Sequence, residues 1–282
     1  MNINNDAQAI PTVSSTPVRP PQHKKIDIGV AGSTPFISRF LLGMAGASVL
    51  SLYLLHIDWW QLGSRAGSIA NIFIKMAHFS AQGLDFTLLS FADTFSIMVL
   101  STIYSIVAGL VFGLLAAENV IRNRVISTVI KAFFTFLRAV PTPVWVLLML
   151  VCFGFGPVAG ITGLSIHTVA FFTRAFSQAF EDVPQDTIDS LESLGASRLQ
   201  IICCGILPSA VTQLISWIAL RFEINFSECT ILGMVGAGGI GFAISTSIQN
   251  YQYGQAGVAI FLVFLFAFFL ERGFLAVKKA IR

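Results

Sequence analysis

The chain has 282 residues, of which 55% are hydrophobic and only 11% are charged. Soluble globular domains carry about 25% charged residues, so this composition argues against a soluble protein and favours a membrane protein. The net charge of +3 does not indicate nucleic-acid binding, because the Lys and Arg residues are scattered between apolar blocks. The four cysteines lack the paired spacing of a zinc site, so no metal centre is expected.

The first 35 residues are polar and rich in proline, and they include the pairs Pro20-Pro21 and Lys24-Lys25. This composition predicts a flexible cytoplasmic tail. Residues 36–57 then form an apolar block long enough for a first transmembrane helix. Trp59 and Trp60, which follow it, are typical of the aromatic belt at the lipid headgroups.

Residues 58–92 are expected to form an external loop. Within it, residues 66–79 are only moderately apolar and include Lys75, so they predict a short interfacial helix and not a membrane crossing. The remaining residues, 93–282, are expected to form the core of the membrane domain.

Five further apolar blocks follow, so the sequence predicts an all-α polytopic membrane protein with six transmembrane helices. The third span contains Pro141 and Pro143, which predict a break because proline removes a backbone donor and clashes with the preceding turn. The five blocks are residues 95–117, 127–153, 158–180, 210–235 and 257–277.

The distribution of Lys and Arg predicts that both termini are cytoplasmic, because cytoplasmic segments of membrane proteins are enriched in these residues. Only Arg65 and Lys75 then fall outside. The same orientation places the long polar segment 181–208 on the cytoplasmic face. The residues on the cytoplasmic side are Arg19, Lys24, Lys25, Arg39, Arg122, Arg124, Arg198, Arg272, Lys278, Lys279 and Arg282.

This polar segment resembles the EAA loop of ABC importer permeases, in which a short helix ending near a glycine fits a cleft on the ATPase subunit. Gly195 is suited to the positive φ that ends a helix, and Pro208 to the first turn of the next helix. The resemblance implies a type I ABC importer permease fold, with segment 181–208 as the coupling loop. The matching residues are Asp189, Glu192, Gly195, Ala196, Arg198, Leu207 and Pro208.

Two departures from the family pattern lie in this loop. Ser190 and Leu191 follow Asp189 where the family has Glu followed by Ala, and Gly205 stands where a branched apolar residue is usual. The alternative interpretation is a polar helix-turn-helix loop without a partner.

A second resemblance is to phosphonate importer permeases. It is carried by the segment from Arg221 to Gly241 and by the sequence Gly-x-x-x-Ala-Glu-Asn that begins at Gly113. It implies import of phosphonate, phosphite or phosphate. Ser227 and Glu228 stand where that family has Arg and then Ser. Methionine-type permeases also have a Gly-Ala-Gly-Gly run here and are the alternative.

Charged residues inside a membrane are costly, so they are expected to face the bundle interior, water or each other. Arg138, beside the proline break, is a candidate for contact with an anionic substrate, or else forms an Arg–Glu pair between the third and fifth spans. The candidate path residues are Arg138, Pro141, Pro143, Arg221, Glu223, Asn225 and Glu228. Four glycines, Gly236, Gly238, Gly239 and Gly241, predict a tight turn at the outer end of the fifth span.

No glycine-rich loop ending in Gly-Lys and Ser or Thr occurs in the chain, so it is not expected to be an enzyme or to carry a cofactor. The resemblance implies ATP and Mg on a separate dimer of ATPase subunits, an extracytoplasmic substrate-binding protein, and a second permease copy in a homodimer in the bacterial inner membrane. A stand-alone secondary transporter is the rival hypothesis, but such proteins have paired broken helices, and only one broken span is predicted here.

Overall fold

A computed structural model of the chain describes residues 33–56, 58–121 and 123–281. The predicted tail therefore lies almost wholly outside the described residues. The described part is helical and contains no β-strand, so the predicted all-α class is confirmed. The chain divides into two compact units, Met1–Arg65 and Ala66–Arg282.

The first unit contains α1 (Ser33–Leu54), and α2 (Trp59–Ala77) begins in it. From residue 35 onward every side chain of α1 is exposed, as expected for a helix surrounded by lipid. The helix predicted over residues 66–79 begins earlier, at Trp59. The reason is that Asp58 Oδ1 accepts hydrogen bonds from the backbone N–H groups of Trp60 and Gln61, at 3.1 Å each, and so caps the helix.

The second span also begins earlier than predicted. Helix α3 (Leu84–Ala116) starts directly after Gly83, whose φ is +70°. Residues 84–92, assigned from the sequence to the external loop, are therefore helical. The predicted span covered only the apolar block that begins at residue 95, whereas a helix can extend beyond the apolar region that crosses the membrane.

The predicted break in the third span is confirmed, because α4 (Arg124–Ala139) and α5 (Thr142–Phe153) meet at an angle of 85°. Four helices of the described chain are long and apolar enough to cross a membrane, and this bent pair makes a fifth. The helix over the remaining predicted span, α6 (Pro157–Glu181), is too polar to qualify on composition. It is also the most enclosed helix, contacting α3, α4, α5 and α9, so protein surrounds it in place of lipid.

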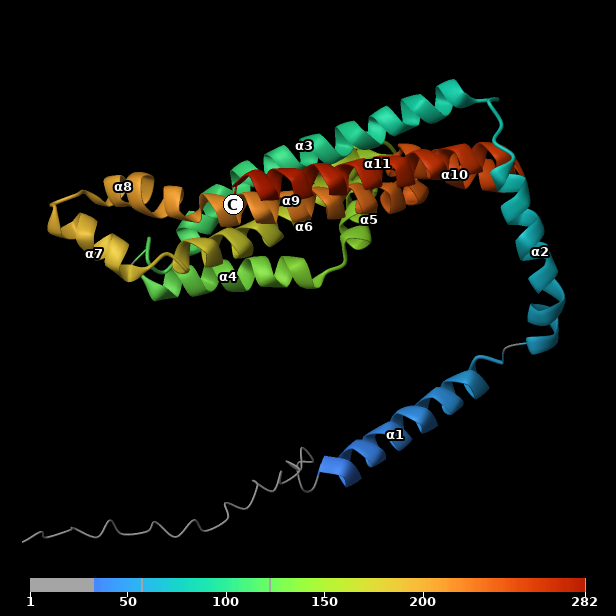
Figure 1. Cartoon of the computed structure of the whole chain (residues 1–282), viewed down its shortest axis with the longest axis horizontal. Helices are drawn as coiled ribbons and strands as arrows, with labels where there is room; N and C mark the ends of the chain where they lie inside the picture. Colours follow the sequence, from blue (N-terminus) through green and yellow to red (C-terminus); the bar gives the residue numbers. More distant parts are fainter. Residues whose placement is uncertain (1–32, 57, 122, 282) are drawn as a thin grey trace, which may run out of the picture. The chain divides into compact units, whose positions relative to one another are not determined.

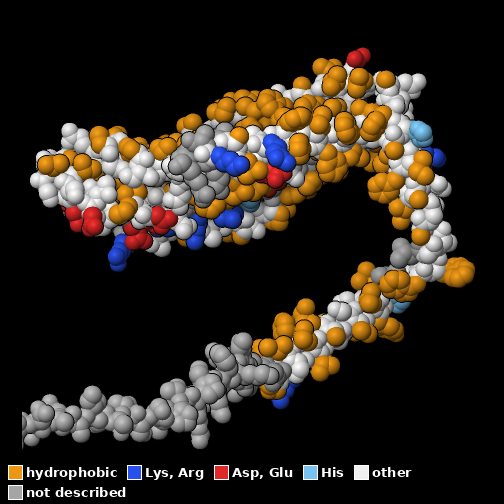
Figure 2. Space-filling view, in the orientation of Figure 1, with side chains coloured by type: hydrophobic (Ala, Val, Ile, Leu, Met, Phe, Trp, Pro, Cys, Tyr) orange, Lys and Arg blue, Asp and Glu red, His pale blue; other side chains and the backbone are white. Residues whose placement is uncertain are grey.

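The C-terminal half contains two short helices, α7 (Gln185–Ser193) and α8 (Arg198–Ile201), and two long helices, α9 (Leu207–Leu232) and α11 (Tyr253–Ile281). In Figure 1, α7 and α8 lie at one end of the second unit, while α10 (Ile240–Gln249) lies toward the other. The sequence prediction missed α10. Figure 2 shows apolar side chains over the middle of the bundle and acidic ones near the α7 end.

The core of the second unit is built where α3 and α6 meet. Small residues on α3 let the two backbones approach closely: a Cβ atom on Gly109 would collide with Phe172, and one on Gly113 would lie 2.9 Å from Phe176 Cβ. The rings of Phe172 and Phe176 are stacked with centroids 4.9 Å apart. This contact fixes α6 against α3 along a seam that leads to the end of the bundle carrying α7.

Candidate functional site

Helix α7 ends in the geometry predicted for Gly195. The φ of Gly195 is +77°, its N–H donates to the Glu192 carbonyl at 2.9 Å, and the Ala196 N–H donates to the Leu191 carbonyl at 3.1 Å. Together these bonds form a Schellman motif. A Cβ atom at position 195 would meet no atom within 4 Å, so the backbone conformation, not space, favours glycine here.

The chain then reverses into a second helix through a capping box. The Gln200 side chain accepts from the Ser197 N–H at 2.7 Å, and the reciprocal bond from the Gln200 backbone to the Ser197 side chain is also present. From Arg198 the chain stays helical through α8, a π-helical turn η1 (Ile202–Ile206) and α9, and a second such turn, η2 (Gly233–Ala237), is broken at Gly236, whose φ is +120°. Pro208 lies just after η1. Because α8 continues through η1 into α9, continuous helical backbone joins the turn that follows Gly195 to the membrane-spanning helix.

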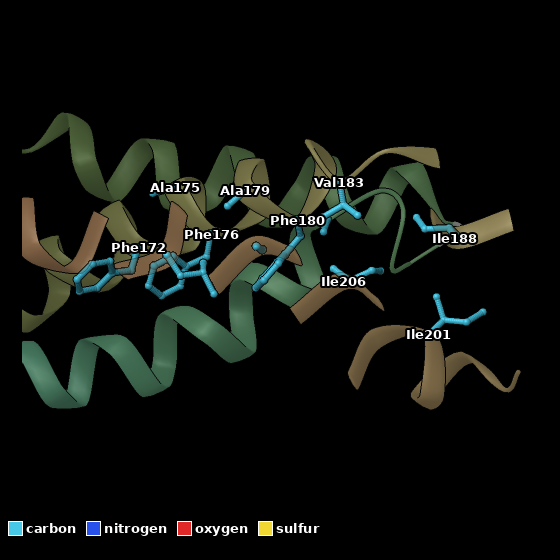
Figure 3. Packing of buried hydrophobic residues seen from close by; sticks show 12 residues of the cluster. Phe172, Ala175, Phe176, Ala179, Phe180, Val183, Ile188, Ile201 and Ile206 are labelled. Atoms are coloured by element: carbon cyan, nitrogen blue, oxygen red, sulfur yellow. The ribbon is translucent and has the colours of Figure 1, made fainter. Parts of the chain in front are cut away.

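Buried apolar side chains fix this hairpin to the bundle. Ile188 from α7, Ile201 from α8 and Ile206 from η1 are at most 6% exposed. They belong to one continuous cluster with the α6 phenylalanines, which we call the anchor cluster (Figure 3). Its buried members are Ala117, Phe172, Ala175, Phe176, Ala179, Phe180, Val183, Ile188, Ile201, Ile206, Ala210 and Leu214.

Two leucines at the tip of the hairpin point away from the anchor cluster. Leu194 is 83% exposed and Leu199 is 74% exposed. We call residues 185–201 the coupling hairpin. Exposed leucines at the polar end of a membrane bundle have neither lipid nor core around them, so they indicate a protein-binding surface. Asp189, Glu192 and Arg198 are exposed on the same hairpin.

The end of the bundle beside the coupling hairpin is held by polar contacts. Glu181 Oε1 accepts from Lys131 Nζ at 2.7 Å and from the Glu118 N–H at 2.8 Å, and Asn119 Nδ2 donates to the Phe180 carbonyl at 2.6 Å. The Ala-Glu-Asn part of the motif beginning at Gly113 thus joins α3, α4 and α6 where the hairpin emerges.

A second polar group lies inside the bundle. Arg221 on α9 is 3% exposed, and its Nη2 atom lies 3.0 Å from Glu228 Oε2 and 3.2 Å from Thr168 Oγ1. Asn225, fully buried, accepts from Thr168 at 3.1 Å and donates to Thr102 at 2.8 Å. These contacts join α3, α6 and α9 through hydrogen bonds shielded from lipid.

The predicted path residues therefore divide into two groups. Arg221 and Asn225 are enclosed, and Glu228 neutralises Arg221 within the same helix, so the cross-helix Arg–Glu pair weighed from the sequence is not present among the described ion pairs. Arg138, Pro141, Pro143 and Glu223 are exposed. The Arg138 guanidinium lies 5.3 Å from the centre of the Phe171 ring, and Arg221 lies 5.4 Å from the same ring.

The chain turns sharply at the glycine run after α9. The φ angles are +120° at Gly236, +82° at Gly238 and +78° at Gly239, and a Cβ atom on Gly241 would collide with the Thr230 carbonyl. The turn is tied to α3 by the Ile240 N–H, which donates to Thr94 Oγ1 at 2.7 Å. Its position on the outer side of the membrane stays a prediction.

The sequence pattern of the binding-protein-dependent transport system inner membrane component family matches residues 109–277, more than half of the chain. The chain belongs to this family. The matched region contains the coupling hairpin, the polar group around Arg221 and the glycine turn. The permease is accordingly a multi-pass inner-membrane protein of a transport system.

Relatives of this permease include the phosphate-import permease protein PhnE of Mycolicibacterium smegmatis, which is 29% identical over 84% of this chain and 45% of that protein. The permease thus spans less than half of that relative's length. The putative phosphite transport system permease protein HtxC of Stutzerimonas stutzeri is 28% identical over 76% of each chain. The probable D-methionine transport system permease protein MetI of Pasteurella multocida is 29% identical over 54% of this chain and 75% of that one.

Among solved structures, a chain of the methionine ABC transporter MetNI in an inward-facing conformation aligns with a TM-score of 0.66. The alignment covers 72% of this permease and all of that chain, at 20% identity. This likeness concerns the fold, and it confirms the predicted type I ABC importer permease fold.

Several features of the site were not identified from the sequence. Gly109 and Gly113 form a small-x-x-x-small pattern that is readable in the sequence. Arg174 is a cation inside the predicted span 158–180, which by itself indicates a functional position. Nothing in the sequence marks Leu194 and Leu199 as exposed, because their exposure depends on which side of the hairpin packs against the bundle.

Proposed function

We propose that this permease is the membrane-spanning subunit of an ATP-driven importer that carries phosphonate, phosphite or phosphate inward by alternating access. ATP and Mg would be held by a separate dimer of ATPase subunits, and a binding protein on the outer side would deliver the solute. The names of the two relatives above that concern phosphorus oxyanions support this class of substrate.

The observation that carries the proposal is the coupling hairpin. It presents Leu194 and Leu199 outward, while Ile188 and Ile201 hold its inner side in the anchor cluster. A partner that binds the two leucines would move the hairpin as one body, because the inner side of the hairpin packs on α6. The continuous helix from α8 into α9 would carry that movement into the membrane, where it would favour one of two bundle arrangements.

The orientation and the homodimer are further parts of the proposal. The Lys and Arg distribution supports cytoplasmic termini, and this orientation would put the hairpin on the side where ATP is available. A second copy is supported by one face of α9, on which Glu223 and Ser227, one helical turn apart, are exposed. Polar residues on the outside of a membrane helix require water or protein beside them, which a path between two copies would supply.

The proposal is tested by isolating the tagged permease from its native bacterium with the proteins that accompany it and reconstituting the complex in liposomes. We expect an ATPase subunit to co-purify. We also expect ATP enclosed in the vesicles to drive uptake of phosphite, phosphate or methylphosphonate in the presence of an ionophore, through the complexes whose ATPase subunits face the lumen. Uptake that the ionophore abolishes while ATP is plentiful would identify an ion-coupled transporter instead, and uptake of methionine alone would overturn the proposed substrate.

Gly195 supplies a more specific test. We expect Gly195→Val to reduce both co-purification of the ATPase and uptake, because valine is strained at a φ of +77° and would distort the turn between the leucines. Gly273→Val on α11 is the matched control, since Gly273 has open space around it and no positive φ. Unchanged uptake in Gly195→Val would contradict coupling through this hairpin.

A further inference from the structure

We infer that the groove between α4 and α6 binds a phosphate-type oxyanion, attracted by two cations: Arg174, which lines the groove, and Arg138, which adjoins the lining residue Ala139. The inference depends on the proposed function, since it locates the substrate class on particular residues. The groove is open and has a volume of about 540 Å³. Because a water molecule occupies about 30 Å³ in the liquid, an oxyanion with several waters fits there.

Polar side chains of both helices lie along the groove. Thr128, Lys131, Thr135 and Arg138 recur at the three- and four-residue intervals that place side chains on one face of α4. Helix α6 runs antiparallel and contacts this face at successive levels: Glu181 with Lys131, Arg174 with Thr135, and Phe171 with Arg138. A polar strip therefore runs along two helices of the membrane bundle, beside apolar lining from Ala132, Phe136 and Ala139 that makes up most of the groove's surface.

The charges along this strip are unevenly balanced. Lys131 is neutralised at the coupling end by Glu181, 2.7 Å away, and by Glu118, 3.6 Å away. Arg138 and Arg174 are exposed, and among the described residues no carboxylate lies within ion-pair distance of either. Inside a bilayer an unpaired cation is strongly disfavoured unless water or an anion accompanies it. The strip thus carries two positive charges that an anionic ligand would stabilise.

The donors suit a tetrahedral oxyanion. Arg174 Nη1 donates to Thr135 Oγ1 at 3.0 Å, which aims the guanidinium along the groove and leaves its other N–H groups for a ligand. Guanidinium groups bind phosphate through paired N–H donors, whereas the Thr135 hydroxyl already donates to the Lys131 carbonyl at 2.6 Å and serves to hold Arg174. Arg221, by contrast, is buried and already neutralised by Glu228, so it does not serve this role.

The spacing along α6 places the two cations at different depths. With a rise of about 1.5 Å per residue, Arg174 lies about 10 Å from Glu181, and Phe171, which contacts Arg138, about 15 Å from it. The latter is about half of a hydrocarbon core of roughly 30 Å. An oxyanion moving inward would pass from Arg138 to Arg174 and then reach the neutralised Lys131. A weaker last site favours release, since transport requires binding that still permits departure.

Two other anions are alternatives for the same cations. A phospholipid headgroup offers the same phosphate chemistry from the membrane side. Glu223 of a second copy would offer a carboxylate, because Glu223 is exposed and has no ion-pair partner among the described residues.

The test uses the complete complex in proteoliposomes containing phosphatidylglycerol, with phosphite and inorganic phosphate as probes. Arg138→Gln, Arg174→Gln and the charge-conserving Arg174→Lys are compared with Arg272→Gln, which removes an exposed arginine from α11. We expect KM for the transported probe to rise about tenfold in each Gln variant, by less in Arg174→Lys, and not at all in Arg272→Gln. Thermal unfolding and ATPase co-purification identify any variant that fails to fold, and Arg174→Lys then supplies the decisive measurement.

The outcomes separate the possibilities. If the unaltered complex carries no phosphorus oxyanion, the proposed function itself is wrong. If it does, and all three groove variants match Arg272→Gln in KM and in bound phosphatidylglycerol measured by mass spectrometry, the groove inference is overturned. Unchanged KM with loss of bound phosphatidylglycerol supports the oxyanion site and identifies the headgroup as its ligand. An equal rise of KM in Glu223→Gln favours an intersubunit ion pair and overturns the inference.

Discussion

The side chain of Leu191 on α7 occupies the space that a side chain at Gly205 would need, since a Cβ atom at position 205 would lie 2.7 Å from Leu191 Cδ1. These are two positions at which the sequence departs from the EAA pattern, with a larger residue at 191 and a smaller one at 205. The two residues face each other across the contact between α7 and η1. The larger side chain at position 191 therefore fills the space that the smaller residue at position 205 leaves. The coupling hairpin therefore keeps its packing despite both changes.

This relationship predicts compensation. Gly205→Val should destabilise the protein by about 1–3 kcal/mol through overpacking, and Leu191→Ala by about 1–2 kcal/mol through a cavity. In the double variant, the added valine fills the space that the leucine leaves. A double-mutant cycle from chemical unfolding in detergent should thus give a coupling energy of at least about 1 kcal/mol. Simple additivity of the two effects would show that the residues do not pack together.

The exposed leucines of the coupling hairpin should be required for partner binding and not for folding. Leu194→Ser and Leu199→Ser each remove an apolar side chain that contacts no core, so we expect the unfolding midpoint to stay the same while less ATPase subunit co-purifies. Leu275→Ser, at an exposed leucine of α11, is the matched control. Loss of thermal stability in the two hairpin variants would indicate that these leucines pack within the permease.

Features of this structure that depend on local sequence chemistry were predictable, whereas features that depend on contacts between helices were not. Apolar blocks and the Pro141 break are set by local chemistry, so the spans and the bend were predictable, as was the positive φ of Gly195. The span that corresponds to α6 was predicted as an apolar block. The polar residues within α6 are tolerated because other helices surround it, which the sequence alone does not reveal. The role of Arg221 likewise depended on Glu228, which lies seven residues away, two turns along the same helix face.

We expect Glu181 to contribute more to the stability of the bundle than an exposed ion pair does. It is partly buried and accepts from both Lys131 and the Glu118 backbone, so Glu181→Gln is expected to destabilise the bundle by about 1–3 kcal/mol. Arg124→Gln is the control, because the Arg124 side chain is 87% exposed and lies 3.6 Å from Glu118. An exposed pair of this kind contributes at most about 1 kcal/mol. Thermal unfolding in detergent compares the two variants, and equal effects would contradict a special role for Glu181.

The pair formed by Arg221 and Glu228 should behave as a buried ion pair whose two members are needed together. Glu228→Gln leaves the guanidinium, which is 3% exposed, without its counter-charge, and we expect a loss of about 2–4 kcal/mol of stability. Removing both charges in Arg221→Met with Glu228→Gln should restore much of that loss, because no unpaired charge then stays buried.

The matched control for this pair is Glu223→Gln on the same helix. Glu223 is exposed and unpaired among the described residues, so its neutralisation should leave the unfolding midpoint unchanged. The charge-free double variant also separates packing from transport. If it recovers stability and retains uptake, the pair serves to hold α9 in place, as its enclosure by Thr168 and His167 indicates. A double variant less stable than Glu228→Gln alone would show that Arg221 stabilises the bundle through its hydrogen bonds to α6 and not through Glu228.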